Sequence, residues 1–99
     1  DRCIAAKLIS PAHENVFHVF PFLTPKRDQL KAFLAENGVG TKIHYFRPPY
    51  LQPCYPEMNH LEFPVAKRIA DEELSLPCNS SLNDEDIIRV SKLINQFLV

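Results

Sequence analysis

The chain has 99 residues, of which 45% are hydrophobic and 23% are charged, and its formal net charge is −1. This length allows one domain with a modest core, so we expect a single domain over residues 1–99. The small net charge gives no reason to expect nucleic acid as a partner, and no apolar run approaches the roughly 18 residues of a membrane span. Cys3, Cys54 and Cys78 are odd in number and widely spaced, which favours free thiols in a reducing compartment.

The N-terminal part of the chain predicts a frayed helix and then a strand. Cys3 to Ile9 is a short apolar segment in which we expect the frayed helix, followed by a break over residues 11–15. Val16 to Phe22 is rich in β-branched and aromatic residues, which favour a strand. Pro21 has no backbone N–H and therefore indicates an edge strand or the end of a strand.

The next predicted element is a helix that begins at Pro25 and ends near Asn37. Thr24 is a suitable N-cap, and proline is favoured at the first helical position. The apolar face of this helix contains Leu30, Phe33 and Leu34. Gly38 follows, and glycine readily adopts the left-handed conformation that ends many helices.

A second strand is predicted from Thr41 to Tyr45, because apolar or β-branched residues alternate there with Lys42 and His44. Pro48 and Pro49 end this strand and stiffen the chain after it. Four prolines lie within nine residues from Pro48 onward, so we expect an ordered but irregular surface excursion.

The C-terminal part predicts a helix, a short strand and a last helix. The first helix runs from Phe63 to about Glu73 and points Val65, Ile69 and Ala70 inward. Leu74 to Leu76 is the strand, which Pro77 closes, and Asn83 caps the last helix. The apolar residues of that helix recur at helical spacing: Ile87, Val90, Leu93, Ile94, Phe97 and Leu98. Three short strands that alternate with helices predict a small sheet covered by helices.

His44 and Tyr45 are the leading candidates for ligand contact, because they end a predicted strand just before a rigid turn. Taken alone, a histidine in such a position is more often a hydrogen-bonded structural residue than a catalyst, and the pattern at Tyr45 favours a buried or half-buried strand residue. The histidines and cysteines show no paired metal-ligand spacing, so no metal site is expected.

Several segments resemble motifs of one enzyme family. Gly38 to Tyr45 resembles the "GIGT-x-IHYP" segment of the DegT/DnrJ/EryC1/StrS family, whose members are sugar-nucleotide aminotransferases that use pyridoxal phosphate. The other similar segments follow in the family's order: Val16–Phe20 ("V-W/Y-H-L-F"), Lys26–Leu30 ("x-R-D-E-L"), Pro49–Gln52 ("P-H-x-Q"), Phe63–Ala66 ("F-P-x-A/T"), Leu74–Pro77 ("L-S-L-P") and Leu82–Asp86 ("L-T-D-E-E"). The resemblance covers roughly residues 15–98.

This resemblance implies the C-terminal small domain of a fold-type I aminotransferase. The expected fold is α/β of the α+β type, with a small, mainly antiparallel three-stranded sheet covered by helices. The chain starts at Asp1 without a Met or a signal region, so we expect it to be a fragment of a longer enzyme. That enzyme would aminate a keto-deoxysugar linked to a nucleoside diphosphate, for polysaccharide, lipopolysaccharide or natural-product glycan biosynthesis.

The resemblance also implies that His44 and Tyr45 bind the sugar nucleotide. Arg47 is a third candidate, because a guanidinium can hold a diphosphate with two hydrogen bonds, although a solvated surface arginine is an equal alternative. Phe46 stands where the family has proline, and Tyr50 stands where it has histidine, which puts the preferred sugar in doubt. His18 is interpreted as a structural strand residue.

No lysine in this chain matches the family's Schiff-base context, so we expect no catalytic residue and no bound cofactor in these 99 residues. Pyridoxal phosphate would belong to the N-terminal domain of the full-length enzyme. The expected amino donor is glutamate, and the full-length enzyme is expected to be a cytoplasmic homodimer. The alternative is a stand-alone binding module that kept this domain and lost catalysis.

Overall fold

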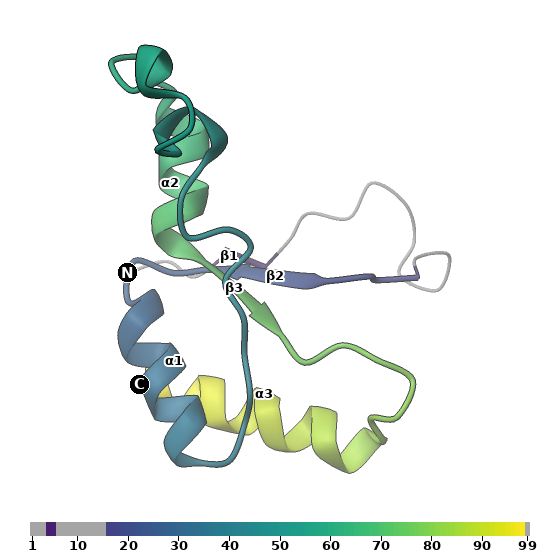
Figure 1. Cartoon of the computed structure of the whole chain (residues 1–99). Coiled ribbons are helices and arrows are strands. Elements are labelled where there is room, and N and C mark those ends of the chain that lie inside the picture. Colours follow the sequence, from purple (N-terminus) through teal and green to yellow (C-terminus); the bar gives the residue numbers. More distant parts are fainter. Residues whose placement is uncertain (1–3, 6–15, 99) are drawn as a thin grey trace.

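A small antiparallel sheet lies between the helices of the molecule (Figure 1). The computed structural model describes residues 4–5 and 16–98, and the structural statements that follow concern these residues. The sheet has the order β1-β2-β3, formed by β1 (Ile4–Ala5), β2 (Phe20–Leu23) and β3 (Glu73–Leu76). The antiparallel α/β fold is therefore confirmed.

Strand β2 lies in the middle of the sheet and contains Pro21, so the edge strand, one of the two positions predicted from this proline, is wrong. Pro21 is opposite Ser75 of β3, but the N–H and C=O groups of Ser75 bond to Lys42 on the other side of β3. The pair Pro21–Ser75 is thus a non-hydrogen-bonded pair, and the proline costs the ladder between β2 and β3 nothing. The strand also starts later than predicted, because Phe17 has a left-handed φ of 43°.

The predicted strand Thr41–Tyr45 is wrong. Only Lys42 pairs there, through an isolated antiparallel bridge to Ser75. The chain turns at His44, whose backbone N–H donates to the Glu73 carboxylate 2.7 Å away instead of to a strand carbonyl. The third strand of the sheet is β1 instead, so Ile4 and Ala5 form a strand where a helix was expected. The rest of that predicted helix and the break at 11–15 lie outside the described residues.

Helices α1 (Arg27–Glu36) and α3 (Asp84–Leu98) pack together below the sheet in the view of Figure 1. Their contact forms the core, which consists of Leu30, Leu34, Val39, Leu74 and Ile94. Helix α1 begins two residues later than predicted, and Thr24 accepts the N–H of Lys26 rather than capping the helix itself. Gly38 ends the helix region with φ 77°, as predicted. Asn83 caps α3 by accepting the N–H of Asp86 at 2.9 Å, also as predicted.

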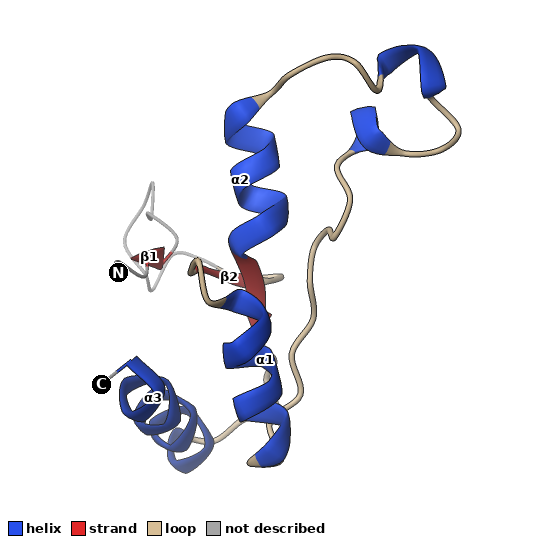
Figure 2. Cartoon of the chain, turned by 90° about the vertical axis from the view of Figure 1, so that its left-hand side faces the viewer, coloured by secondary structure: helices blue, strands red, loops and turns tan. Residues whose placement is uncertain are grey.

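Helix α2 (Pro64–Glu72) rises on the opposite side of the sheet and leads away from the core (Figures 1 and 2). Ala70 is buried, but Val65 is 73% exposed and Ile69 is 42% exposed, so their predicted inward orientation is wrong. On α3, Ile94 is buried as predicted, whereas Ile87 and Leu98 are exposed. These helices therefore bury a narrower apolar face than their sequence period suggests.

The proline-rich segment forms an arm beside α2, with 3₁₀ turns at Pro49–Leu51 and Pro56–Met58 (Figure 2). The Asn59 amide donates to the carbonyls of Tyr50 and Tyr55, at 2.8 and 3.1 Å. The rings of Tyr50 and Phe63 meet edge to face at a centroid distance of 5.0 Å. These contacts confirm the prediction of an ordered, irregular excursion.

Candidate functional site

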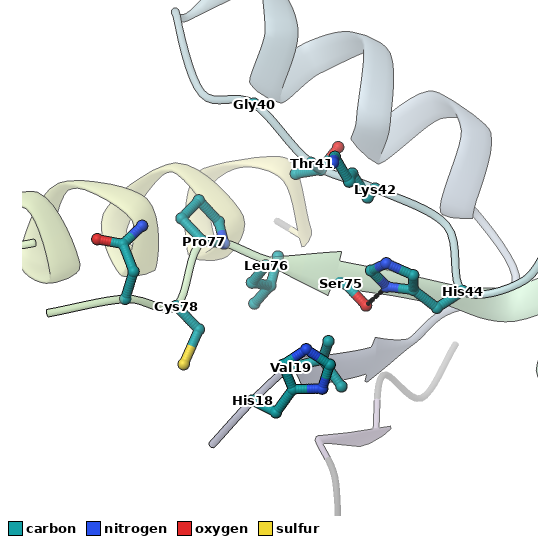
Figure 3. A pocket seen from close by; sticks show the side chains of 11 residues that line it. His18, Val19, Gly40, Thr41, Lys42, His44, Ser75, Leu76, Pro77 and Cys78 are labelled. Atoms are coloured by element: carbon teal, nitrogen blue, oxygen red, sulfur yellow. Dashed lines mark hydrogen bonds between the residues drawn. The ribbon is translucent and has the colours of Figure 1, made fainter. Parts of the chain in front are cut away.

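A cleft of about 490 Å³ opens where the loop after α1 crosses the ends of β2 and β3 (Figure 3). The loop contributes Thr41, Lys42 and His44, and the approach to β2 contributes His18 and Val19. The complete lining is His18, Val19, Gly40, Thr41, Lys42, His44, Ser75, Leu76, Pro77, Cys78 and Asn79. Segments far apart in the sequence meet there because the Lys42–Ser75 bridge ties the loop to β3.

His44 is the most firmly held of the predicted site residues. Its Nδ1 lies 2.7 Å from Oγ of Ser75, and its backbone N–H donates to Oε2 of Glu73 at 2.7 Å. Ser75 in turn donates its hydroxyl proton to Oε1 of Glu73. Since Glu73 and Ser75 are two residues apart on β3, their side chains leave the strand on the same face and both reach the loop.

Tyr45 and Arg47 lie elsewhere, in a second hollow of about 410 Å³ beside the arm and α2. Tyr45 is 74% exposed, so the half-buried strand position considered for it does not occur. A cis peptide bond joins it to His44, and the two rings meet edge to face at 5.4 Å. The three predicted substrate contacts are therefore adjacent but face two different hollows.

His18 differs from its interpretation as a structural strand residue. It lies before β2, is exposed, and lines the same cleft as His44 (Figure 3). Lys42, Ser75 and Glu73 are further site residues that were not singled out from the sequence. The only sequence signal for Ser75 is its place in the "L-S-L-P" segment, and nothing in the sequence pairs Glu73 with His44.

The cleft is suited to an anionic ligand. Lys42 supplies a positive charge to it, His18 and His44 supply ring nitrogens for hydrogen bonds, and the described lining residues include no carboxylate. The loop backbone at Gly40 and Thr41 also borders the cleft, and Lys31 donates to both the carbonyl and the hydroxyl of Thr41, which fixes this stretch. A concave surface of one charge sign concentrates ligands of the opposite sign.

The described residues do not fit pyridoxal phosphate. That cofactor needs a lysine for the Schiff base and a carboxylate against the pyridine nitrogen, but the described lining of the cleft offers Lys42 and no acid. Lys67 donates a hydrogen bond to the Asp71 carboxylate, and this bond, together with the negative charge of Asp71, raises the pKa of Lys67, which is the opposite of what a nucleophilic amine requires. No step through the cofactor can therefore be derived from these side chains.

Within the described part of the chain, no three His, Cys, Asp or Glu residues gather as a metal site. Cys54 and Cys78 are free thiols, as predicted. None of the described helices combines the length and apolar character that crossing a membrane requires.

The chain is thus an α/β domain with a three-stranded antiparallel sheet and a cleft at the end of β3. The sequence model of the DegT/DnrJ/EryC1/StrS aminotransferase family matches residues 4–95, and the chain belongs to this family. The match confirms the resemblance seen in the motifs.

Three relatives show the extent of the similarity. A pleiotropic regulatory protein of Geobacillus stearothermophilus is 39% identical over 84% of this chain and 23% of its own length. The dTDP-3-amino-3,6-dideoxy-alpha-D-galactopyranose transaminase of Aneurinibacillus thermoaerophilus is 32% identical over 84% of this chain and 23% of its own. The crystal structure of S. venezuelae DesV, in complex with a ketimine intermediate, superposes with a TM-score of 0.76 at 32% identity, covering 81% of this chain and 22% of DesV. The chain thus spans about a quarter of the length of these relatives.

Proposed function

We propose that this chain is the C-terminal part of a pyridoxal-phosphate-dependent aminotransferase that aminates a nucleotide-linked keto-deoxysugar. The observation that carries the proposal is the basic cleft around a firmly held His44, in a chain that belongs to a family of aminotransferases. A sugar nucleotide combines a diphosphate, which a basic cleft attracts, with hydroxyls, which imidazole and phenol groups bind.

The proposal gives the three predicted residues separate roles. His44 contacts the sugar from the cleft, while Tyr45 and Arg47 extend the binding surface into the hollow beside the arm. Arg47 is exposed. Its backbone carbonyl accepts a hydrogen bond from the side-chain amide of Gln52 at 2.8 Å, and this bond fixes the turn between the two residues. Its guanidinium remains available to pair with a phosphate.

Catalysis and cofactor binding belong, in this proposal, to the N-terminal part of the longer enzyme. Pyridoxal phosphate supplies the chemistry of amine transfer when it is bound there. Glutamate is the proposed amino donor, and the enzyme acts as a cytoplasmic homodimer in the synthesis of surface polysaccharides or natural-product glycans. The 99-residue chain alone is proposed to be inactive.

The test is an assay of the complete protein against amino sugars linked to dTDP, UDP and GDP, with 2-oxoglutarate as the amino acceptor. Conversion of at least one of them, with release of glutamate, supports the proposal. If none reacts while the purified protein is folded and holds pyridoxal phosphate, the aminotransferase proposal is wrong.

The second candidate is a binding module without catalysis. It is favoured by one observation, the regulatory name of the Geobacillus stearothermophilus relative. The same assay separates the two candidates: a module binds a sugar nucleotide in calorimetry but transfers no amine.

A further inference from the structure

The hydrogen bonds around Glu73 fix where the proton of His44 lies. Glu73 is only 3% exposed, and both of its carboxylate oxygens act as acceptors. Oε2 accepts the backbone N–H of His44, and Oε1 accepts the hydroxyl of Ser75, which is also buried. Two accepting oxygens are the pattern of an ionised carboxylate, which has no proton to donate.

A serine hydroxyl carries one proton, and the Ser75 proton is already used toward Glu73. The 2.7 Å contact between Oγ of Ser75 and Nδ1 of His44 therefore needs its proton from the imidazole. Nδ1 is the N–H nitrogen of neutral His44, and Nε2 is left with a lone pair. Within the described part of the chain, no hydrogen bond reaches Nε2, and the ring lines the cleft (Figure 3).

We propose that Glu73 and Ser75 are positioning residues that hold His44 as its Nδ1–H tautomer and present Nε2 to the substrate as a hydrogen-bond acceptor. The proposal rests on the proposed function, since it assumes that His44 meets the sugar nucleotide. It also narrows that function: a neutral imidazole with a free Nε2 lone pair binds a group that donates, which is a sugar hydroxyl and not a phosphate oxygen.

The carboxylate also holds the loop, because it accepts the backbone N–H of the same residue whose side chain it orients. Backbone and imidazole of His44 are thereby fixed by one pair of side chains on one rigid strand. The hydrogen bonds to Glu73 and Ser75 thus fix a residue that itself contacts the ligand. In other proteins a carboxylate or carbonyl sets the tautomer of a functional histidine in a similar way.

The test reads the tautomer directly, by ¹⁵N NMR of the complete protein labelled at histidine. The His44 signals are identified by their loss in His44→Gln. We expect Nδ1 to carry the proton in the unaltered protein. Ser75→Ala should lose this preference, whereas Ser75→Thr, which keeps the hydroxyl, should retain it.

Glu73→Gln is the complementary variant, because its amide can donate to Ser75. The Ser75 hydroxyl is then free to donate to Nδ1, and the proton of His44 should move to Nε2. A merely structural role for Glu73 predicts lost stability without this change of tautomer.

Kinetics link the tautomer to function. With whichever dTDP-, UDP- or GDP-linked amino sugar reacts fastest, Ser75→Ala should lower kcat/KM about five-fold, the effect of one hydrogen bond, and Ser75→Thr should restore it. The proposal is overturned if Nε2 carries the proton in the unaltered protein. It is also overturned if Ser75→Ala changes the tautomer of His44 without changing kcat/KM, while His44→Ala lowers kcat/KM. If no sugar nucleotide reacts, the proposed function fails, and the tautomer measurement still decides how Glu73 and Ser75 hold His44.

Discussion

At the scale of single residues, the site depends on contacts that join β3 to the loop after α1. His44 reaches the cleft because Ser75 and Glu73 hold it from the strand behind it. Tyr45, the next residue, faces the neighbouring hollow and is largely exposed. One rigid and one exposed side chain stand side by side, so substitutions at the two positions should have different consequences.

His44→Ala and Tyr45→Phe in the complete protein should impair sugar-nucleotide use more than binding of pyridoxal phosphate. Each lost hydrogen bond should cost on the order of 1 kcal/mol of transition-state binding, or about five-fold in kcat/KM. Steady-state kinetics with the sugar nucleotide and a titration with the cofactor measure the two effects. His60→Ala is the matched control, because His60 is exposed and lies on the arm outside both hollows. Unchanged kinetics in both variants would return these residues to structural roles.

Arg27 is a buried residue whose replacement should destabilise the fold. The residue is 4% exposed, and its guanidinium donates to the carbonyls of Ala70 and Glu73 at 2.7 and 3.3 Å and lies 5.8 Å from the ring centre of Phe46. Arg27→Ala leaves these carbonyls without their charged donor. The free energy of unfolding should fall by about 1.5–3 kcal/mol for each lost hydrogen bond. Thermal or urea unfolding measures the loss. Asp28→Asn is the control. Asp28 pairs with Arg27 from the surface, so the free energy of unfolding should change by no more than about 1 kcal/mol. An equal loss of stability in both variants would contradict the buried, stabilising role of Arg27.

The sequence could identify site residues that lie close to His44 along the chain, but it could not identify those that reach His44 only through the fold. His44 and Tyr45 stand in a recognisable local motif. Glu73 and Ser75 lie about 30 positions away from His44. Their contact depends on the register of β3 against the loop, and no local pattern encodes that register.

At the scale of elements, the helices were more predictable than the strands. Helical spacing, Gly38 and Asn83 locate α1 and α3 within a few residues, because these signals are local. The segment 41–45 alternates like a strand, but its backbone bonds to a side chain at His44, so only Lys42 pairs. The exposure of Val65 was also missed, because amphipathic spacing does not say whether a partner covers the apolar face.

The end of α1 offers a test of backbone conformation alone. A Cβ at Gly38 would meet no atom within 4 Å, but the φ angle of Gly38 is 77°. Gly38→Ala should therefore destabilise the protein by about 1–2 kcal/mol, and only because alanine disfavours the left-handed conformation. Gly40→Ala is the matched control, since a Cβ there also meets nothing and φ is not positive. Urea unfolding of both variants measures the difference. Equal stabilities would mean that the helix ends without a left-handed residue.

At the scale of the whole molecule, one chemical prediction follows from the cleft, whose described lining offers no lysine and carboxylate pair for the cofactor. The purified 99-residue chain should form no internal aldimine with pyridoxal phosphate and should transfer no amine. Absorbance spectroscopy before and after borohydride treatment measures this, and the complete protein is the positive control. An aldimine band that borohydride abolishes, followed by recovery of a single modified lysine, would locate the cofactor in this chain after all.

The distribution of apolar surface predicts how the chain behaves when it is alone. The apolar segments Cys3–Ile9 and Val16–Phe22 predict an exposed docking face in a domain that rests against a larger one. Among the described side chains of these segments, Val16 and Val19 are the exposed large apolar ones. Further exposed apolar side chains lie on two helices on opposite sides of the sheet, namely Val65 and Ile69 on α2 and Ile87 and Ile88 at the start of α3. Exposed apolar side chains on a helix face indicate a contact with another part of the protein or a second copy, and a small domain has little stability in reserve.

The isolated 99-residue chain should therefore fold with marginal stability and self-associate in a concentration-dependent way, because burial of this surface gains roughly 25 cal/mol per Å². Sedimentation velocity and thermal melting over a range of concentrations measure both properties. Val65→Lys places a charge at a 73% exposed apolar position of α2 and should weaken the association without lowering the melting temperature of the monomer. Ala32→Lys adds the same charge at an exposed position of α1 and should leave association unchanged. A chain that stays monomeric at all concentrations and melts at high temperature would instead favour the self-sufficient binding module, since such a module needs no partner to cover its surface.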